Sequence, residues 1–213
     1  MALGCLLSAC LLAHVDAAAG SQVRPQSAHR VAPAEAGLAT DPTFQETAGE
    51  VRNALRAAGF TLAEGAGPPA QVVVIVAYGV DAPRVRLRAR TEDVAAFTPG
   101  GSPSTTGAAG RAPSVDYGAV GTRTVTLRAA TSVRHVSFAA YDAQAVAAGQ
   151  APPPLWTVTV TSEGADDIGA ALPAMIVAAA PWFGKSTGRR VDVATPLEGR
   201  AVEAVRRGVG PPK

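Results

Sequence analysis

The stretch Gln71-Val-Val-Val-Ile-Val-Ala-Tyr-Gly-Val80 decides the fold class. It is a continuous apolar run rich in β-branched side chains, which is typical of a strand buried on both faces of a sheet. We therefore expect this segment to be the centre of the sheet, with helices covering it.

An amphipathic helix is expected before this strand. Apolar residues recur at helical spacing between residues 44 and 58. Thr43 and Glu46 have the spacing of a capping box at the start of the helix, and Gly59 is the residue type that ends one. The helix should pack on the sheet, so we expect Leu55 to be buried.

Further strands are predicted on both sides of this pair of elements. The segments with alternating or β-rich sequence are 30–34, 83–90, 123–128, 133–141, 155–161 and 189–193. A second helix should follow Asp166 and Asp167 and be kinked or delayed by Pro173, and a third should start at a Thr195/Glu198 capping box. The predicted fold class is α+β, a single mainly antiparallel sheet of about five strands covered by two or three helices.

The domain organisation follows from composition along the 213 residues. Residues 1–19 are predicted to be a signal peptide, and residues 20–40 a tether or irregular lead-in. Residues 41–208 form the α/β domain, which contains a long loop at 98–121 dense in Gly, Pro, Ser and Thr, and residues 209–213 are a tail.

The N-terminal sequence predicts export. The run from Ala2 to Ala13 is apolar, carries no charge and is too short to span a bilayer as a helix. Leu7-Ser8-Ala9-Cys10 matches the acylation pattern of bacterial prolipoproteins, which makes Cys10 a candidate lipid anchor. Ordinary secretion with cleavage within residues 15–20 is an alternative, and a cytoplasmic chain is a third. The predicted location is the periplasm, and if Cys10 is acylated the protein is anchored by its lipid to the outer membrane.

Composition excludes several functional classes. Both cysteines lie in the first ten residues, so nothing after Cys10 can form a thiolate metal site or a disulfide. A net charge of +2 and a pI near 8.8 give no electrostatic case for nucleic-acid binding.

Several segments together resemble a family of uncharacterised exported proteobacterial proteins, known only as a domain of unknown function in lipoproteins. The segments that carry the resemblance are Glu50–Phe60, Leu155–Gly164, Asp167–Pro173 and Ala180–Gly188. They span about residues 44 to 194. The resemblance implies an exported protein, and it provides no catalytic residue that could be carried over to this chain. Leu11 and Leu12 depart from the family, since polar residues usually follow the lipid-bearing cysteine.

No motif predicts a cofactor or a metal. Gly184-Lys185-Ser186-Thr187 looks like the end of a phosphate-binding loop, but that pattern needs a glycine where Ala179 stands. The segment also leaves a helix and enters a strand, so a helix end is the better interpretation. His14, His29 and His135 have no metal-ligand spacing, and Asp166-Asp167 is interpreted as a helix cap.

The segment Pro83–Arg90 contains the strongest charge pattern. In an extended strand Arg84, Arg86, Arg88 and Arg90 share one face. The simpler interpretation is a solvated strand face, or an edge strand whose charges resist pairing with another chain. The functional alternative is a basic stripe that contacts an anionic membrane surface.

The sequence as a whole predicts an exported, non-catalytic accessory or scaffold protein of the bacterial cell envelope. Its partners would be other envelope proteins or an anionic membrane surface, without cofactors or nucleic acid. One alternative is a periplasmic hydrolase with an unrecognised site in the 98–121 loop, and another is a soluble secreted ligand-binding module. A cleft holding two titratable groups in contrasting environments would favour the enzyme, and a closed pocket would favour the binding module.

Overall fold

The computed structural model describes residues 10–20, 25–63, 69–94, 121–164 and 167–208, with backbone only for 84–94 and 121–130. The chain divides into two units, Met1–Pro83 with Thr131–Lys213, and Arg84–Ala130. In chain order the elements are β1 (Cys10–Ala19), β2 (His29–Pro33), η1 (Ala36–Thr40), α1 (Pro42–Ala57), β3 (Val72–Val80), β4 (Arg84–Val94), β5 (Gly121–Asp142), α2 (Ala143–Ala147), β6 (Trp156–Gly164), α3 (Ile168–Ala179), η2 (Ala180–Trp182), β7 (Val191–Pro196) and α4 (Arg200–Arg207).

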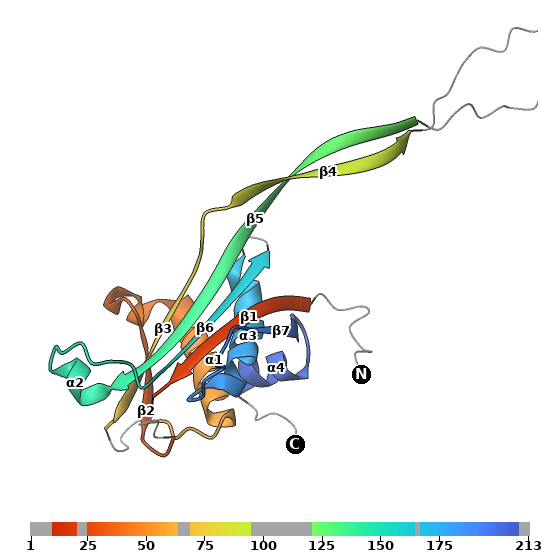
Figure 1. Ribbon diagram of the computed structural model, residues 1–213. Coiled ribbons are helices and arrows are strands. Elements are labelled where there is room, and N and C mark those ends of the chain that lie inside the picture. Colours follow the sequence, from red (N-terminus) through yellow and green to blue (C-terminus); the bar gives the residue numbers. More distant parts are fainter. Residues whose placement is uncertain (1–9, 21–24, 64–68, 95–120, 165–166, 209–213) are drawn as a thin grey trace, which may run out of the picture. The chain divides into compact units, whose positions relative to one another are not determined.

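The strands form one mixed sheet, and the fold is α+β as predicted (Figure 1). The strand order is β2-β3-β5-β6-β1-β7, and β4 pairs with β5. β2 runs parallel to β3, whereas β3 with β5, β5 with β6, β6 with β1 and β1 with β7 are antiparallel. The prediction of a mainly antiparallel sheet of about five strands is therefore corrected to a mixed and larger sheet.

Strand β3 is buried on the face covered by the helices, whereas Ile75 and Ala77 on its other face are only partly buried, and the strand is not central. Val72, Val74 and Val76 are each at most 2% exposed. β3 nevertheless lies next to the edge strand β2, and β5 and β6 occupy the middle of the order. The reason is that β1 and β7 extend the sheet on the far side of β6.

Residues 10–19 form strand β1 inside the sheet, and here the structure differs from the expectation that residues 1–19 lie outside the fold. β1 pairs with β6 from Ala13↔Ser162 to Ala19↔Trp156, and with β7 from Cys10↔Pro196 to Val15↔Val191. Its inward residues Leu11, Ala13, Val15 and Ala17 are all buried. Alternation of buried and exposed positions is the pattern of a strand covered on one face. Residues 1–9 lie outside the described residues.

The predicted lead-in at 20–40 is also structured in its described part. β2 and η1 occupy most of residues 29–40, and β2 corresponds to the short strand expected at 30–34. The Val31↔Val74 register places β2 beside β3. The domain core therefore begins at β1 and not at residue 41.

The helices begin at caps that the sequence predicted in part. Asp41 caps α1 by accepting a hydrogen bond from the Phe44 N–H at 2.9 Å, with Pro42 in the first turn, so the predicted Thr43 cap is wrong. Asp167 caps α3, which contains Pro173 within its length. α4 starts after Gly199, so the predicted Thr195/Glu198 capping box is wrong as well.

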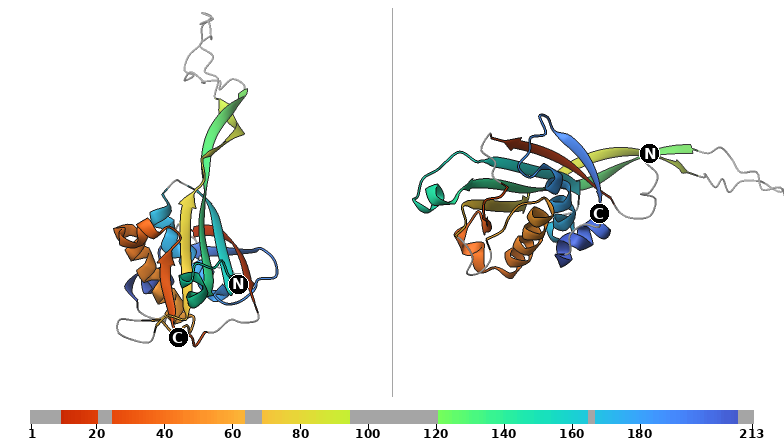
Figure 2. Two further views of the ribbon diagram at one scale, coloured as in Figure 1. Left: turned by 90° about the vertical axis from the view of Figure 1, so that its left-hand side faces the viewer. Right: turned by 90° about the horizontal axis from the view of Figure 1, so that it is seen from below.

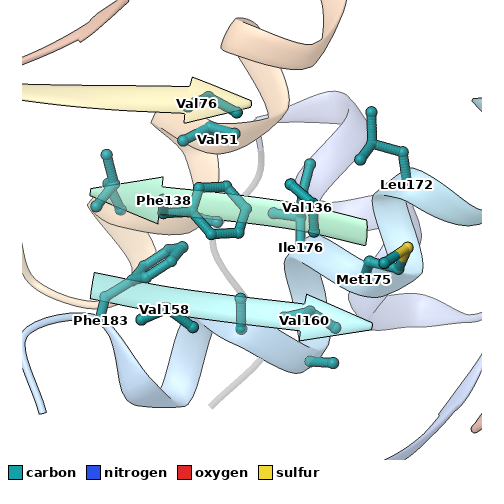
Figure 3. Packing of buried hydrophobic residues seen from close by; sticks show 14 of the residues in the cluster. Val51, Val76, Val136, Phe138, Val158, Val160, Leu172, Met175, Ile176 and Phe183 are labelled. Carbon is teal, nitrogen blue, oxygen red and sulfur yellow. The ribbon is translucent and has the colours of Figure 1, made fainter. Parts of the chain in front are cut away.

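Helices α1, α3 and α4 lie on one face of the sheet, and the hydrophobic core lies between them and the strands (Figures 2 and 3). Val136, Phe138, Val158 and Val160 project from β5 and β6 toward α3, and all are fully buried. Leu55, expected to be buried, is 0% exposed, and Trp156 of β6 is 1% exposed. Within the described part of the chain, no helix is long and apolar enough to cross a membrane.

The second unit contains β4 and the first part of β5. β4 is the strand predicted from the arginine alternation, and it pairs with β5. β5 is one strand of 22 residues where two separate strands were expected at 123–128 and 133–141. The predicted loop at 98–121 lies outside the described residues except for Gly121.

Candidate functional site

A cavity of about 290 Å³ lies among α1, α3, α4 and the end of β3. Its polar lining comes from Glu46, Thr47 and Glu50 of α1, Tyr78 of β3 and Arg206 of α4. Ile168, Leu172 and Pro173 of α3 supply an apolar wall. The volume lies just below the usual range for small-molecule pockets, about 300–1,000 Å³.

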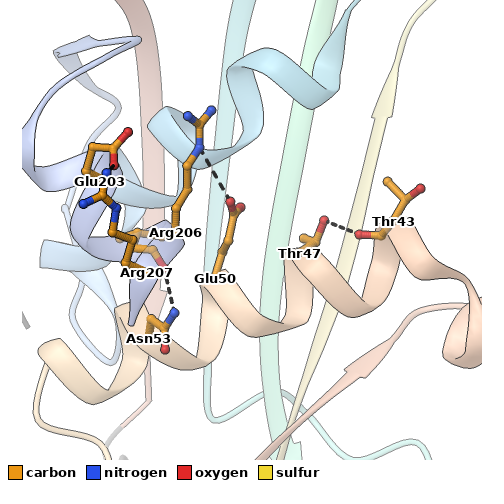
Figure 4. Close-up of polar contacts among 8 residues, drawn as sticks. Thr43, Thr47, Glu50, Asn53, Glu203, Arg206 and Arg207 are labelled. Carbon is orange, nitrogen blue, oxygen red and sulfur yellow. Dashed lines mark hydrogen bonds and ion pairs between the residues drawn. The ribbon is translucent and has the colours of Figure 1, made fainter. Parts of the chain in front are cut away.

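Helical spacing on α1 places its polar groups in the cavity. Thr43, Thr47 and Glu50 recur at intervals of four and three residues, so they share one face of the helix, and Glu46 lies beside them. The Thr47 hydroxyl donates to the Thr43 carbonyl at 2.9 Å (Figure 4). Glu46 is exposed and Glu50 is buried, so two carboxyl groups one turn apart occupy contrasting environments.

Glu50 is the most unusual residue of the cavity. It is 6% exposed and lines the cavity, and among the described residues Arg206 is its ion-pair partner. The nearest cation is Arg206, whose Nε lies 4.0 Å from Oε1, beyond hydrogen-bond distance (Figure 4). Burial raises the pKa of Glu50 to about 7, an effect that Arg206 opposes and Glu46 reinforces.

Arg206 reaches the cavity because α4 is held against α1. The side-chain amide of Asn53 donates to the Val205 carbonyl at 2.7 Å (Figure 4). Gly208 ends α4 with φ +72°, a left-handed conformation that favours glycine. The neighbouring Arg207 forms an ion pair with Glu203 at 2.6 Å. Its partner therefore lies on its own helix and not in the cavity.

Arg134 is a second buried charged group on the same face of the sheet. It is 8% exposed and donates to the Ser162 hydroxyl at 3.2 Å and the Glu163 carbonyl at 3.3 Å, while its Nε has no hydrogen-bond partner. Burial lowers its pKa, and the charge of Asp167 opposes this shift. A side chain at position 164 would clash with this guanidinium, because a Cβ on Gly164 would lie 2.4 Å from its Nη2. Arg134 does not line the cavity.

The histidines lie apart from the cavity and do not converge. His14 Nδ1 lies 2.5 Å from Asp192 Oδ1, and His135 Nδ1 lies 3.6 Å from Asp81 Oδ1. The His135 ring leans over Gly79 on β3, away from β6 and β1. His29 donates from Nδ1 to the Ser27 carbonyl at 2.6 Å, and burial lowers its pKa. Among the residues that the structure describes, no group of His, Cys, Asp and Glu could hold a metal ion.

The segment Gly184–Thr187 has a structural role at the edge of the sheet. The Ala17 N–H donates to the Thr187 hydroxyl at 3.1 Å, and the Ala19 N–H donates to the Ser186 hydroxyl at 2.8 Å. These bonds satisfy β1 beyond Val15, where its pairing with β7 ends. The contacts support the interpretation of this segment as a helix end and turn, and not as a phosphate loop.

The residues singled out from the sequence lie outside the cavity. Cys10 is the first residue of β1, opposite Pro196 of β7, and its thiol is not free. No observation tests lipid attachment at Cys10, which stays a prediction. Arg84, Arg86, Arg88 and Arg90 occupy alternate positions of β4. Sequence reasoning missed the cavity residues, although Glu50 interrupts the apolar stripe of α1 and so gave a signal. Comparison with protein families, curated proteins and solved structures finds no match at any of the three levels.

Proposed function

We propose that the protein is an exported, non-catalytic accessory protein of the bacterial cell envelope that binds a small molecule in the cavity beside Glu50. The observation that carries the proposal is a buried carboxyl group that lines a cavity of about 290 Å³ and whose ion-pair partner, Arg206, lies beyond hydrogen-bond distance. Buried polar groups in folded proteins are normally satisfied, and exceptions tend to mark functional sites.

The physical argument is that a ligand can donate a hydrogen bond to the Glu50 carboxylate. Burial makes the charged form of Glu50 costly, and Arg206 offsets this cost only in part from beyond hydrogen-bond distance. A ligand that donates to Glu50 recovers this cost on binding, and the wall formed by Leu172 and Pro173 offers apolar surface to the rest of the molecule.

The test uses access to the cavity. Thr43 lies at the cavity and is exposed, so Thr43→Trp should obstruct the cavity without disturbing the core, and Thr43→Ala is the matched control. Two-dimensional NMR with a library of small polar fragments should shift the signals of residues 46–50 and 168–173 in the wild type and in the control. If no fragment shifts these signals, or if Thr43→Trp binds fragments as the wild type does, the proposal is wrong.

A hydrolase is the second candidate, and the contrast between Glu46 and Glu50 favours it. A buried carboxyl group with a raised pKa is suited to act as a general acid, and an exposed carboxylate nearby is suited to act as a base. The lining contains no histidine or cysteine, so the carboxylate of Glu46 would act either as a base on water or as the nucleophile. Turnover of chromogenic glycosides or esters that disappears in both Glu46→Gln and Glu50→Gln would favour this enzyme over the binding protein.

The proposal of export takes a form that keeps β1. A signal removed before Cys10 leaves the strand whole, whereas cleavage within residues 15–20 removes most or all of it from between β6 and β7. We therefore expect the mature chain from its native host to contain residues 10–19. Intact-mass measurement decides this, because it reports both the first residue and any added lipid.

We also propose that the arginine stripe of β4, Arg84, Arg86, Arg88 and Arg90, contacts an anionic membrane surface. The support is that β4 is extended, since an extended backbone gives alternate residues the same side of the strand. Each basic residue near an anionic surface contributes about 1 kcal/mol. Such contacts would hold an accessory protein at the envelope.

A further inference from the structure

We propose that the ligand of the Glu50 cavity carries a primary alkylammonium group, whose nitrogen pairs with the Glu50 carboxylate while its alkyl chain lies against Ile168, Leu172 and Pro173. This inference rests on the proposed binding function and names the chemical class of its ligand. It stands on the charges and the surfaces that the cavity presents.

The charges around Glu50 leave room for one cation. The charged lining residues are Glu46 and Glu50 of α1 and Arg206 of α4, Tyr78 of β3 also lines the cavity, and the lining residues of α3 are uncharged. When Glu50 is ionised, as at pH 8, two carboxylates against one guanidinium give a net charge of −1, which one ammonium group neutralises. An anionic ligand would instead add to the repulsion between Glu46 and Glu50.

The hydrogen-bonding groups also suit an ammonium group. The carboxylate of Glu50 accepts only, and its ion-pair partner Arg206 is 4.0 Å away, too far to donate a hydrogen bond to it. The hydroxyl of Thr47 uses its proton on the Thr43 carbonyl, so its oxygen is left to accept. An ammonium group brings three donors and no acceptor, which matches such a lining better than a carboxylate or a carbonyl does.

Binding of a cation should be coupled to proton release. Because the pKa of Glu50 lies at about 7, this carboxyl group is close to half protonated at neutral pH in the free protein. An ammonium group binds the ionised form, so its apparent affinity should rise as the pH increases through 7. The rise should level off once Glu50 is fully ionised, and the affinity should fall where the amine itself loses its proton, with a pKa of about 10.4 for a lysine-like amine.

The experiment compares three probes of matched length, namely n-pentylamine, 1-pentanol and pentanoate. Titration of the full chain at pH 8, followed by NMR, should show n-pentylamine binding at least ten times more tightly than the other two. Glu50→Gln should weaken amine binding at least tenfold. The control Glu203→Gln should leave it unchanged, because Glu203 pairs with Arg207 and does not line the cavity.

A second variant predicts the opposite sign, which protects the test from a simple loss of folding. Arg206→Gln removes the cation that competes for Glu50 and should strengthen amine binding. Calorimetry at pH 7 in two buffers of different ionisation heat should also show proton release in the wild type and none in Glu50→Gln.

The outcomes separate the ligand class from the binding function. Pentanol or pentanoate binding in the cavity as tightly as the amine would overturn the ammonium proposal and leave the binding proposal standing. Amine binding that Glu50→Gln does not weaken would also overturn it. If no probe or fragment shifts the signals of the cavity residues, both proposals fail.

Discussion

The two faces of the sheet treat the same residue types differently. Leu11 and Leu12 are consecutive in β1, yet Leu11 is 3% exposed beneath the helices and Leu12 is 58% exposed on the face that no described helix covers. Charged groups on the two faces also differ in their exposure to solvent. His14 and Asp192 pair on the uncovered face in contact with solvent, while Glu50 on the covered side is buried and its ion-pair partner Arg206 lies 4.0 Å away.

The two faces differ in the energetic cost of their charged groups. On the uncovered face, water screens charges and satisfies hydroxyl groups, so the side chains there cost little. On the covered face, Glu50 and Arg134 have their charged forms disfavoured by burial. Both residues lie in the layer between the sheet and the helices, which also forms the hydrophobic core. We therefore expect the functional site in that layer.

The largest expected effect comes from removing β1. A chain starting at Ser21 should fail to fold cooperatively, because β6 and β7 lose their common partner and the core loses Leu11, Ala13, Val15 and Ala17. A chain starting at Cys10 is the control and should fold. Circular dichroism with thermal unfolding measures both, and a cooperative transition in the shorter chain would show that β1 is dispensable.

The leucine pair tests the comparison directly. Leu11→Ala should lower the free energy of unfolding by about 2–5 kcal/mol through lost burial and the cavity that remains. Leu12→Ala should change it by about 0.5 kcal/mol or less, since this side chain is mostly in water. Urea denaturation gives both values. Equal effects at the two positions would mean that the faces do not differ as described.

Glu50 should make stability depend on pH with a defined sign. Its pKa is raised from 4.5 to about 7 on folding, so the unfolded chain releases this proton first and stability falls as the pH rises from 4.5 to 7. The loss is at most about 3 kcal/mol. Glu50→Gln should flatten this part of the profile and raise stability at pH 8, whereas Glu46→Gln, at an exposed position, should leave most of it. A wild-type profile that is flat or rises over this interval contradicts the burial of Glu50.

The smallest effect is expected for the arginine stripe of β4, outside the unit that holds both faces. Arg86→Glu/Arg88→Glu should reduce sedimentation with anionic vesicles, and added salt should do the same because exposed charges are screened within about 10 Å at 0.1 M. The control Arg52→Glu/Arg189→Glu makes the same charge change at exposed positions of the other unit. Equal binding to neutral and anionic vesicles would leave the stripe as a solvated strand face.

Much of the covered face could be predicted from sequence because its signals are local. The periodicity of α1, the valines of β3 and the alternation of β6 each lie within one segment, and the structure confirms all three elements. β1 was missed because Leu12 and Ala18 are apolar residues that face outward, so its alternation was masked and the run resembled a signal. The Thr43 cap was wrong because Asp41 followed by Pro42 is the stronger start.

The candidate site could not be predicted in the same way. Glu50 was visible as a charge in an apolar stripe, but its significance depends on Arg206 and Tyr78, which lie far from it in sequence. Only the packing of α3 and α4 on α1 brings these residues to one cavity. A single sequence contains no local pattern for such a contact.

The place of β1 has a consequence for how the chain folds during synthesis. Its first residue pairs with Pro196, and its last pairs with Trp156, so the sheet cannot close until almost all of the chain has left the ribosome. Contacts between residues so distant in sequence form slowly, and until then the core strands have no stable structure to protect them. A chain that folds this late stays unfolded for most of its synthesis. A chaperone that binds unfolded chain would therefore act most effectively before β7 leaves the ribosome.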